Sequence, residues 1–121
     1  MEKGLLIVGH GSRSLDAQRT FEKIVDMVRK RVSYKVVEGA SMELSKPNIP
    51  TAVEKMAERG IEEILIVPYF LYEGMHIKED IPEIIDGLSK KYKNMIFRMG
   101  QPIGTDPLLL DLIVKRAEEI E

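Results

Sequence analysis

Two short runs of consecutive apolar residues, Leu5–Val8 and Ile64–Val67, constrain the fold of this chain more than any other feature. A strand with one face in solvent alternates apolar and polar residues, whereas a strand covered on both faces of a parallel sheet is apolar throughout. Gly9 ends the first run and Pro68 follows the second, so both runs have the length of a strand. We therefore predict two central strands of a parallel sheet.

The pattern of a strand followed by a helix recurs four times along the chain. The four predicted strands cover Gly4–Val8, Tyr34–Ala40, Ile64–Val67 and about Met95–Met99. The predicted helices begin near Ser14 or Asp16, at Pro50, between Asp80 and Pro82, and at Pro107 after an Asp106 cap, and they extend to about Val32, Arg59, Tyr92 and Ile120. Lys35 and Glu38 interrupt the second strand, so we expect it at an edge of the sheet.

These four units predict one α/β domain over residues 1–121, a three-layer sandwich with a four-stranded parallel sheet flanked by helices. The common strand order for such a small sheet is 2-1-3-4, as in flavodoxin-like folds. In that order the chain turns in opposite directions from the ends of the first and third strands. Ligands bind at this point, outside the carboxyl ends of the strands.

The only two histidines of the chain follow these two strands. His10 follows the first strand, His76 lies beyond the third, and Glu43 lies in the loop after the neighbouring second strand. We expect the three side chains to converge at one edge of the sheet. Two imidazoles and a carboxylate suit a divalent transition metal, and they also suit proton transfer near neutral pH. Taken singly, a histidine beside glycines is more often part of a turn, and Glu43 would be an ordinary solvated residue.

The segment Tyr69–Met75, which leads to His76, is unusually apolar for a loop. One interpretation is that Tyr69 and Leu71 extend the third strand into the core. The other is that the segment forms a wall for a flat apolar ligand, closed by the flexible Gly74. We favour the wall, because a strand alternates faces and some of these side chains should point away from the core.

Composition narrows the possible functions. The chain has a net charge of -2, which gives no sign of a surface for nucleic acid or membrane. It contains no cysteine, so disulfides, a thiolate nucleophile and a cysteine-ligated zinc site are excluded. No signal peptide is expected before the first strand, and no apolar run approaches the roughly 20 residues that span a bilayer. We expect a cytoplasmic protein.

Other motifs leave two further hypotheses open. Ser14 stands where a dinucleotide fingerprint has its third glycine, no Walker A sequence is present, and Ser12 lies outside a G-x-S-x-G elbow. A non-catalytic flavodoxin-like module that binds a metal or an anionic ligand remains possible, since Arg13, Lys46 and Lys78 could favour an acidic ligand. The second hypothesis is a phosphate-handling enzyme with His10 as covalent nucleophile.

Several stretches together resemble one known family. They are Gly-His-Gly-Ser-Arg at 9–13, Met-Glu-Leu at 42–44 with Pro-Asn-Ile-Pro at 47–50, residues 68–76, Asp-Ile-Pro at 80–82 and Gly-Thr-Asp-Pro-Leu at 104–108. In these the chain resembles the small class II tetrapyrrole chelatases, namely the short-form CbiX sirohydrochlorin cobaltochelatases of archaea and their nickel-inserting relatives. The family often has a histidine near the position of Thr105 or Asp106, and this chain has none there.

The resemblance implies insertion of Co²⁺, or of Ni²⁺ or Fe²⁺, into sirohydrochlorin on the way to cobalamin or a related tetrapyrrole. The metal is then a substrate, and no permanent cofactor is implied. By this resemblance His10 is a metal ligand and proton acceptor, His76 is the second metal ligand, and Glu43 assists metal binding or proton removal. The expected contacts to the tetrapyrrole are Lys46, Leu71, Tyr72, Glu73, Gly74, Met75 and His76. The small form is also expected to pair as a homodimer.

Overall fold

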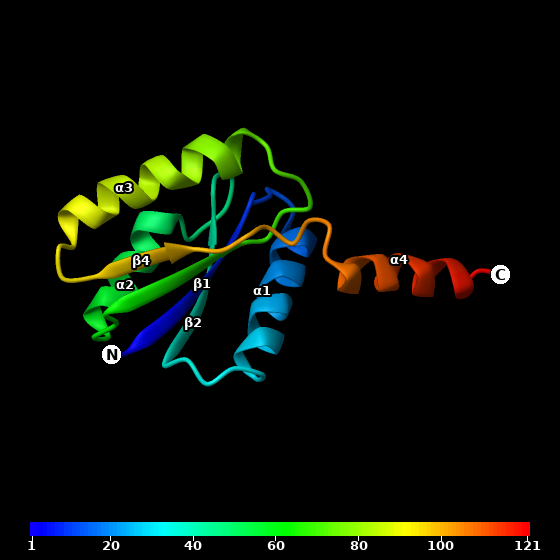
Figure 1. The fold of residues 1–121 in the computed structure, drawn as a ribbon, viewed down its shortest axis with the longest axis horizontal. Coiled ribbons are helices and arrows are strands. Elements are labelled where there is room, and N and C mark those ends of the chain that lie inside the picture. Colours follow the sequence, from blue (N-terminus) through cyan, green and yellow to red (C-terminus); the bar gives the residue numbers. More distant parts are fainter.

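The computed structural model describes all 121 residues and contains a four-stranded parallel sheet in the order β2-β1-β3-β4. The strands are β1 (Lys3–Gly9), β2 (Val36–Ser41), β3 (Glu63–Pro68) and β4 (Ile96–Met99). The helices are α1 (Leu15–Arg29), α2 (Ile49–Glu58), α3 (Ile81–Lys91) and α4 (Pro107–Glu118), and a five-residue π-helical turn, η1 (His76–Asp80), precedes α3 (Figure 1). The predicted α/β class and strand order are confirmed. No helix combines the length and apolarity that crossing a membrane would require.

The two apolar runs form the centre of the sheet, as predicted. β1 pairs in parallel with β2 on one side and with β3 on the other. Side chains that point to opposite faces of these strands are both buried, because helices cover each face. Leu6 and Ile66 pack into a large cluster with residues of α2 and α3, whereas Leu5 and Ile7 pack into a smaller cluster with Val25 of α1.

Capping residues position the helices that follow the strands. Of the two predicted caps of α1, Ser14 and Asp16, it is Ser14 whose side chain accepts a hydrogen bond from the Ala17 N–H. Asn48 accepts one from the Thr51 N–H, so α2 begins at Ile49, one residue before the predicted Pro50. The Asp106 side chain accepts from the Leu108 N–H at the start of α4.

The boundaries on both sides of the α1–β2 connection differ from the prediction. α1 ends at Arg29, so Val32 lies beyond the helix, although it still packs against the smaller cluster. β2 begins at Val36 rather than Tyr34, because the residues between α1 and β2 are needed to reverse the direction of the chain.

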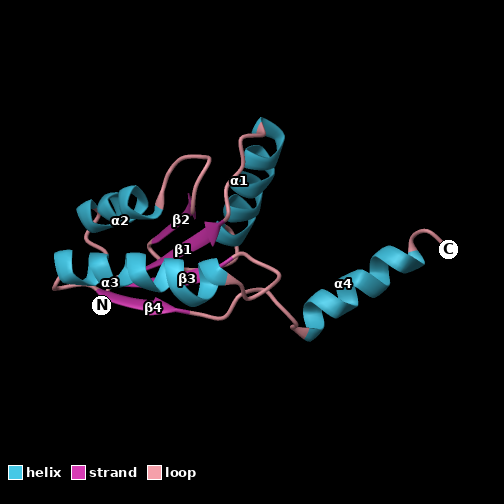
Figure 2. Cartoon of the chain, turned by 90° about the horizontal axis from the view of Figure 1, so that it is seen from above, coloured by secondary structure: helices cyan, strands magenta, loops and turns pink.

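The last helix differs most from the expected three-layer arrangement. α4 extends away from the sheet in both views and buries none of its residues (Figures 1 and 2). Its exposed large apolar side chains are Leu108, Leu110, Leu112, Ile113 and Val114, with Ile120 just beyond the helix. Helical spacing predicts that a helix forms and is amphipathic, but it does not indicate which surface covers the apolar face. Three helices therefore flank the sheet, and α4 does not.

The core predicts a clear contrast between two Leu→Ala substitutions. Leu6 is fully buried in β1 and Leu15 is 64% exposed at the start of α1. We expect Leu6→Ala to lower the free energy of unfolding by about 2–5 kcal/mol, because it leaves a cavity beneath α2. Leu15→Ala should change it by less than about 0.5 kcal/mol. Urea denaturation followed by circular dichroism measures both, and equal effects would contradict this description of the core.

Candidate metal centre

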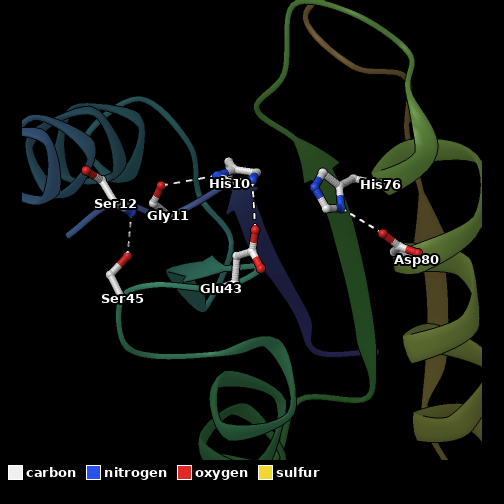
Figure 3. A network of polar contacts seen from close by, with 7 residues as sticks. All are labelled: His10, Gly11, Ser12, Glu43, Ser45, His76 and Asp80. Atoms are coloured by element: carbon white, nitrogen blue, oxygen red, sulfur yellow. Dashed lines mark hydrogen bonds and ion pairs between the residues drawn. The ribbon is translucent and has the colours of Figure 1, made fainter.

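Three side chains from separate parts of the chain meet at the carboxyl ends of the central strands. His10 directly follows β1, Glu43 lies in the loop after β2, and His76 begins η1 after β3. One ligand atom from each lies within 4.8 Å of the others. The two imidazole rings have their centroids 5.1 Å apart (Figure 3). The expected convergence is therefore present in the structure.

Backbone pairing beyond the ends of β1 and β2 brings Glu43 to His10. The Met42 N–H donates to the Gly9 carbonyl at 2.9 Å, and the Glu43 N–H donates to the His10 carbonyl at 3.1 Å. Gly11 has a φ of 100°, and a Cβ at this position would overlap the carbonyl oxygen of Glu43. Only glycine fits both this conformation and this close approach.

Three serines tie the loop after β1 to the loop after β2. The Ser12 N–H donates to Ser45 Oγ at 3.1 Å, and the Ser45 hydroxyl donates to Ser41 Oγ at 3.0 Å. Gln18 of α1 donates from its side-chain amide to the Ser12 carbonyl at 2.8 Å. These bonds hold both loops in place although the site itself is open to solvent.

His10 and Glu43 form a polar pair at the open side of the site. His10 Nε2 lies 3.1 Å from Glu43 Oε1, and His10 Nδ1 lies 3.3 Å from the Gly11 carbonyl oxygen. The Gly11 carbonyl and the Glu43 carboxylate both only accept hydrogen bonds, so a neutral His10 can donate to one of them but not to both. When the hydrogen is on Nδ1, the Nε2 lone pair faces the Glu43 carboxylate oxygen. This arrangement is favourable when a cation, either a proton or a metal ion, stands between the two atoms.

His76 is held from the other side. Its Nδ1 lies 2.8 Å from Asp80 Oδ2 (Figure 3). Its ring centroid lies 6.2 Å from that of Phe70. Phe70 in turn packs against the large core cluster. Sequence reasoning did not include Asp80 among the site residues. The signal that could have found it is its spacing from His76, because residues four apart in a helical turn are neighbours.

The three candidate ligands form an open, incomplete coordination set. Two imidazole nitrogens and one carboxylate oxygen suit Co²⁺, Ni²⁺, Fe²⁺ or Zn²⁺. The His10 and Glu43 side chains are 46% and 55% exposed, so water or a substrate can occupy the remaining positions. A closed structural site would hold its ion with four protein ligands. The arrangement therefore suits an ion that arrives and leaves.

The other residues expected to contact substrate lie on two sides of this centre. Lys46 lines a groove of ≈ 480 Å³ beside His10, together with Ser12 and Ser45. Leu71, Tyr72 and Glu73 line a separate surface depression next to the loop that leads to α4.

The apolar segment before His76 does not enter the core. Tyr69, Leu71, Tyr72 and Met75 are all exposed, and only Phe70 of that segment packs inward. The hypothesis that Tyr69 and Leu71 extend β3 into the core is therefore wrong, because β3 ends at Pro68.

The fold and the site together define an α/β domain with candidate histidine and carboxylate metal ligands at the carboxyl edge of its sheet. The family model described as CbiX matches residues 4–120, so the chain belongs to the CbiX family. The sirohydrochlorin cobaltochelatase of Methanopyrus kandleri is 30% identical, over 95% of this chain and 94% of that protein. The sirohydrochlorin ferrochelatase of Arabidopsis thaliana chloroplasts is 32% identical, but this chain spans only 51% of its length.

Solved structures agree with this assignment. The sirohydrochlorin chelatase SirB of Bacillus subtilis subspecies spizizenii, solved in complex with cobalt, superposes with a TM-score of 0.95 at 33% identity. That match covers 99% of this chain and 51% of SirB. A CbiX protein from Marinobacter aquaeolei superposes with a TM-score of 0.83 at 29% identity, over 98% of this chain and 99% of that one.

The geometry of Gly11 predicts the effect of adding one methyl group. We expect Gly11→Ala to cost about 1–3 kcal/mol of stability through its backbone conformation. It should also push Glu43 away from His10 and weaken Co²⁺ binding. Gly87→Ala is the matched control, because Gly87 lies within α3 with nothing within 4 Å of the new Cβ. That change should stabilise the protein by about 0.4–1 kcal/mol. Urea denaturation and Co²⁺ titration of both variants test this, and unchanged Co²⁺ affinity in Gly11→Ala would contradict it.

Proposed function

We propose that this protein is a sirohydrochlorin cobaltochelatase, with residues 1–121 acting as one chelatase domain that inserts Co²⁺ into the tetrapyrrole. The meeting of His10, Glu43 and His76 in a member of the CbiX family carries this proposal. Cobalt is favoured because the relatives that this chain spans almost completely, from Methanopyrus kandleri and Methanocaldococcus jannaschii, are named cobaltochelatases. Fe²⁺ and Ni²⁺ are alternative metals, since imidazole binds all three ions. The cytoplasmic location stays a prediction.

The metal is held loosely before it is transferred. Nε2 of His76 and Nε2 of His10 face the same space, with the Glu43 carboxylate beside them. Two or three protein ligands leave coordination positions free for the ring nitrogens of the tetrapyrrole. As those nitrogens bind, they replace the protein ligands one at a time, and the ion passes from the protein to the macrocycle.

Insertion also releases protons, because two pyrrole N–H groups lose theirs as the dication enters the ring. His10 is placed to accept one of these two protons at Nε2 once the metal has left that nitrogen, and the other passes to water at the exposed side of the site. The neighbouring Glu43 carboxylate, 3.1 Å away, stabilises the imidazolium that forms and passes the proton to solvent. A general base has to lie within hydrogen-bond reach of the proton that it takes, and the exposed position of His10 allows the ring to approach that closely.

The tetrapyrrole itself is apolar on its faces and carboxylated at its edge. Leu71, Tyr72 and Met75 supply exposed apolar surface on the segment that leads to His76, where the ring can lie. Lys46, Arg13 and Lys78 are exposed and form no ion pair within the chain, so they are free to bind substrate carboxylates.

A homodimer fits the exposed surface of the chain. An isolated helix as short as the 12 residues of α4 is marginal in water, so α4 needs a partner for its apolar face. The sheet offers a complementary surface on its α1 side, where Leu65 and Val67 are only partly buried and Ile96 of β4 is 40% exposed. We infer that α4 of each copy packs on this surface of the other copy.

The catalytic proposal predicts that His10→Ala slows cobalt insertion by about 10²–10⁴-fold, because the proton acceptor is lost. Glu43→Gln, which keeps the shape but removes the charge, should slow it less. The rate is measured from the absorbance of sirohydrochlorin with Co²⁺, relative to the reaction without protein. Glu54→Ala, an exposed carboxylate change on α2, is the control and should keep full activity. Full activity in His10→Ala would contradict the mechanism, and stoichiometric binding without turnover in the unchanged protein would contradict the function.

The dimer predicts that a charge on α4 separates the two copies. Ile113 is 60% exposed in the single chain, so Ile113→Lys should not disturb the fold of the sheet. Light scattering should give the mass of two chains for the unchanged protein and of one chain for this variant. Arg116→Ala on the same helix is the control and should leave the mass unchanged. A monomeric mass for the unchanged protein at working concentration would refute the dimer.

A further inference from the structure

Asp80 makes one specific polar contact, and that contact is with a metal-ligand candidate. Its Oδ2 atom lies 2.8 Å from Nδ1 of His76, a short distance for a nitrogen–oxygen hydrogen bond. Asp80 precedes α3 directly but does not cap it with its side chain, and it pairs with no lysine or arginine. The carboxylate is therefore available to His76 alone.

The π-helical turn η1 holds the two side chains next to each other. The Ile81 N–H donates to the His76 carbonyl, which is the five-residue spacing of a π-turn. Ile77 and Ile81 are both buried and anchor the inner side of the turn in the large core cluster. His76 and Asp80 precede these anchors by one residue each, so they share the outer side. Single π-turns of this kind occur frequently at functional sites.

The chemistry of the pair determines which nitrogen of His76 carries the hydrogen. A carboxylate can only accept hydrogen bonds, so a neutral His76 must place its hydrogen on Nδ1 to bond Asp80. The lone pair is then on Nε2, the nitrogen that faces His10 and Glu43 (Figure 3). A negative carboxylate behind the ring also makes Nε2 a stronger electron donor to a metal.

The two histidines differ in the hydrogen-bond partner of their Nδ1 atom. The contact behind His10 is the neutral carbonyl of Gly11 at 3.3 Å, a longer and weaker bond than the 2.8 Å contact of His76 with a carboxylate. His76 is thus fixed in ring orientation and tautomer, whereas His10 has the freedom that a proton acceptor needs.

We propose that Asp80 is a positioning residue that holds His76 as the Nδ1–H tautomer and so prepares it to bind the metal. This inference deepens the proposed function, because it assigns the two histidines unequal parts: His76 binds the ion firmly, and His10 gives up the ion and takes a proton. Asp80 acts through His76 and touches neither substrate.

The first test leaves Asp80 unchanged. In the unchanged protein without metal or tetrapyrrole, long-range ¹H–¹⁵N correlation spectra at a pH of about 8.5, where imidazole side chains are neutral, report the tautomer of each histidine. His76→Ala identifies which signals belong to His76. We expect the Nδ1–H tautomer for His76, and a predominant Nε2–H tautomer would overturn the proposal.

The second test compares Asp80→Ala with Asp86→Ala, an exposed carboxylate on α3 that pairs only with Lys90. Asp80→Ala should move His76 toward the Nε2–H tautomer and weaken Co²⁺ binding to the tetrapyrrole-free protein by about 10- to 100-fold. The KM for Co²⁺ should rise by a similar factor, with a smaller change in kcat at saturating metal. Asp86→Ala should change none of these values.

The outcomes separate this proposal from the function on which it rests. If Asp80→Ala keeps both the tautomer and the Co²⁺ affinity of the unchanged protein, the positioning role is refuted even where cobalt insertion is confirmed. If the tautomer and affinity change as expected but no tetrapyrrole is metallated, the inference about Asp80 stands and the chelatase function fails.

Discussion

The hydrogen bonds between β1 and its two neighbours determine the position of every candidate ligand. β1 is central and buried, so the residue after it leaves the sheet at a defined point, and that residue is His10. The pairing with β2 continues past the strand ends to Glu43, and the pairing with β3 ends just before the segment that leads to His76. A change that shifts either neighbour along β1 would separate the three side chains while leaving each of them in the protein.

Much of this arrangement could be predicted from the sequence, because apolar runs report burial and the order of a small parallel sheet follows from few alternatives. The expectation that His10 and His76 meet came from that order, and the structure adds the packing of Phe70, Ile77 and Ile81 that places His76. The contact of Asp80 with His76 was missed because the predicted helix began between Asp80 and Pro82, whereas the helical turn η1 already begins at His76 and makes these two residues, four apart, neighbours. The sequence also could not predict that α4 lies away from the sheet, because helical spacing does not indicate which surface a helix packs against.

The site combines a firmly built frame with exposed ligands. Gly11 and the serine hydrogen bonds fix the backbone of the two loops, and the buried Ile77 and Ile81 fix the turn that carries His76. The side chains that would touch the metal are nevertheless open to solvent on one side. This combination suits a protein whose metal is a substrate: the frame keeps the ligands at the right separation, and the open side lets the ion leave.

Because α4 is short and its apolar face is uncovered, the proposed dimer would link the folding of this helix to protein concentration. The sheet and the other helices leave its apolar face uncovered, so in the proposed homodimer the free energy that keeps it helical comes from association. The helical content of the protein would then depend on concentration, with α4 fraying in dilute solution while the sheet and the three packed helices remain folded. One chain would in this way contain a stable domain and a segment that is helical only when the chain is paired.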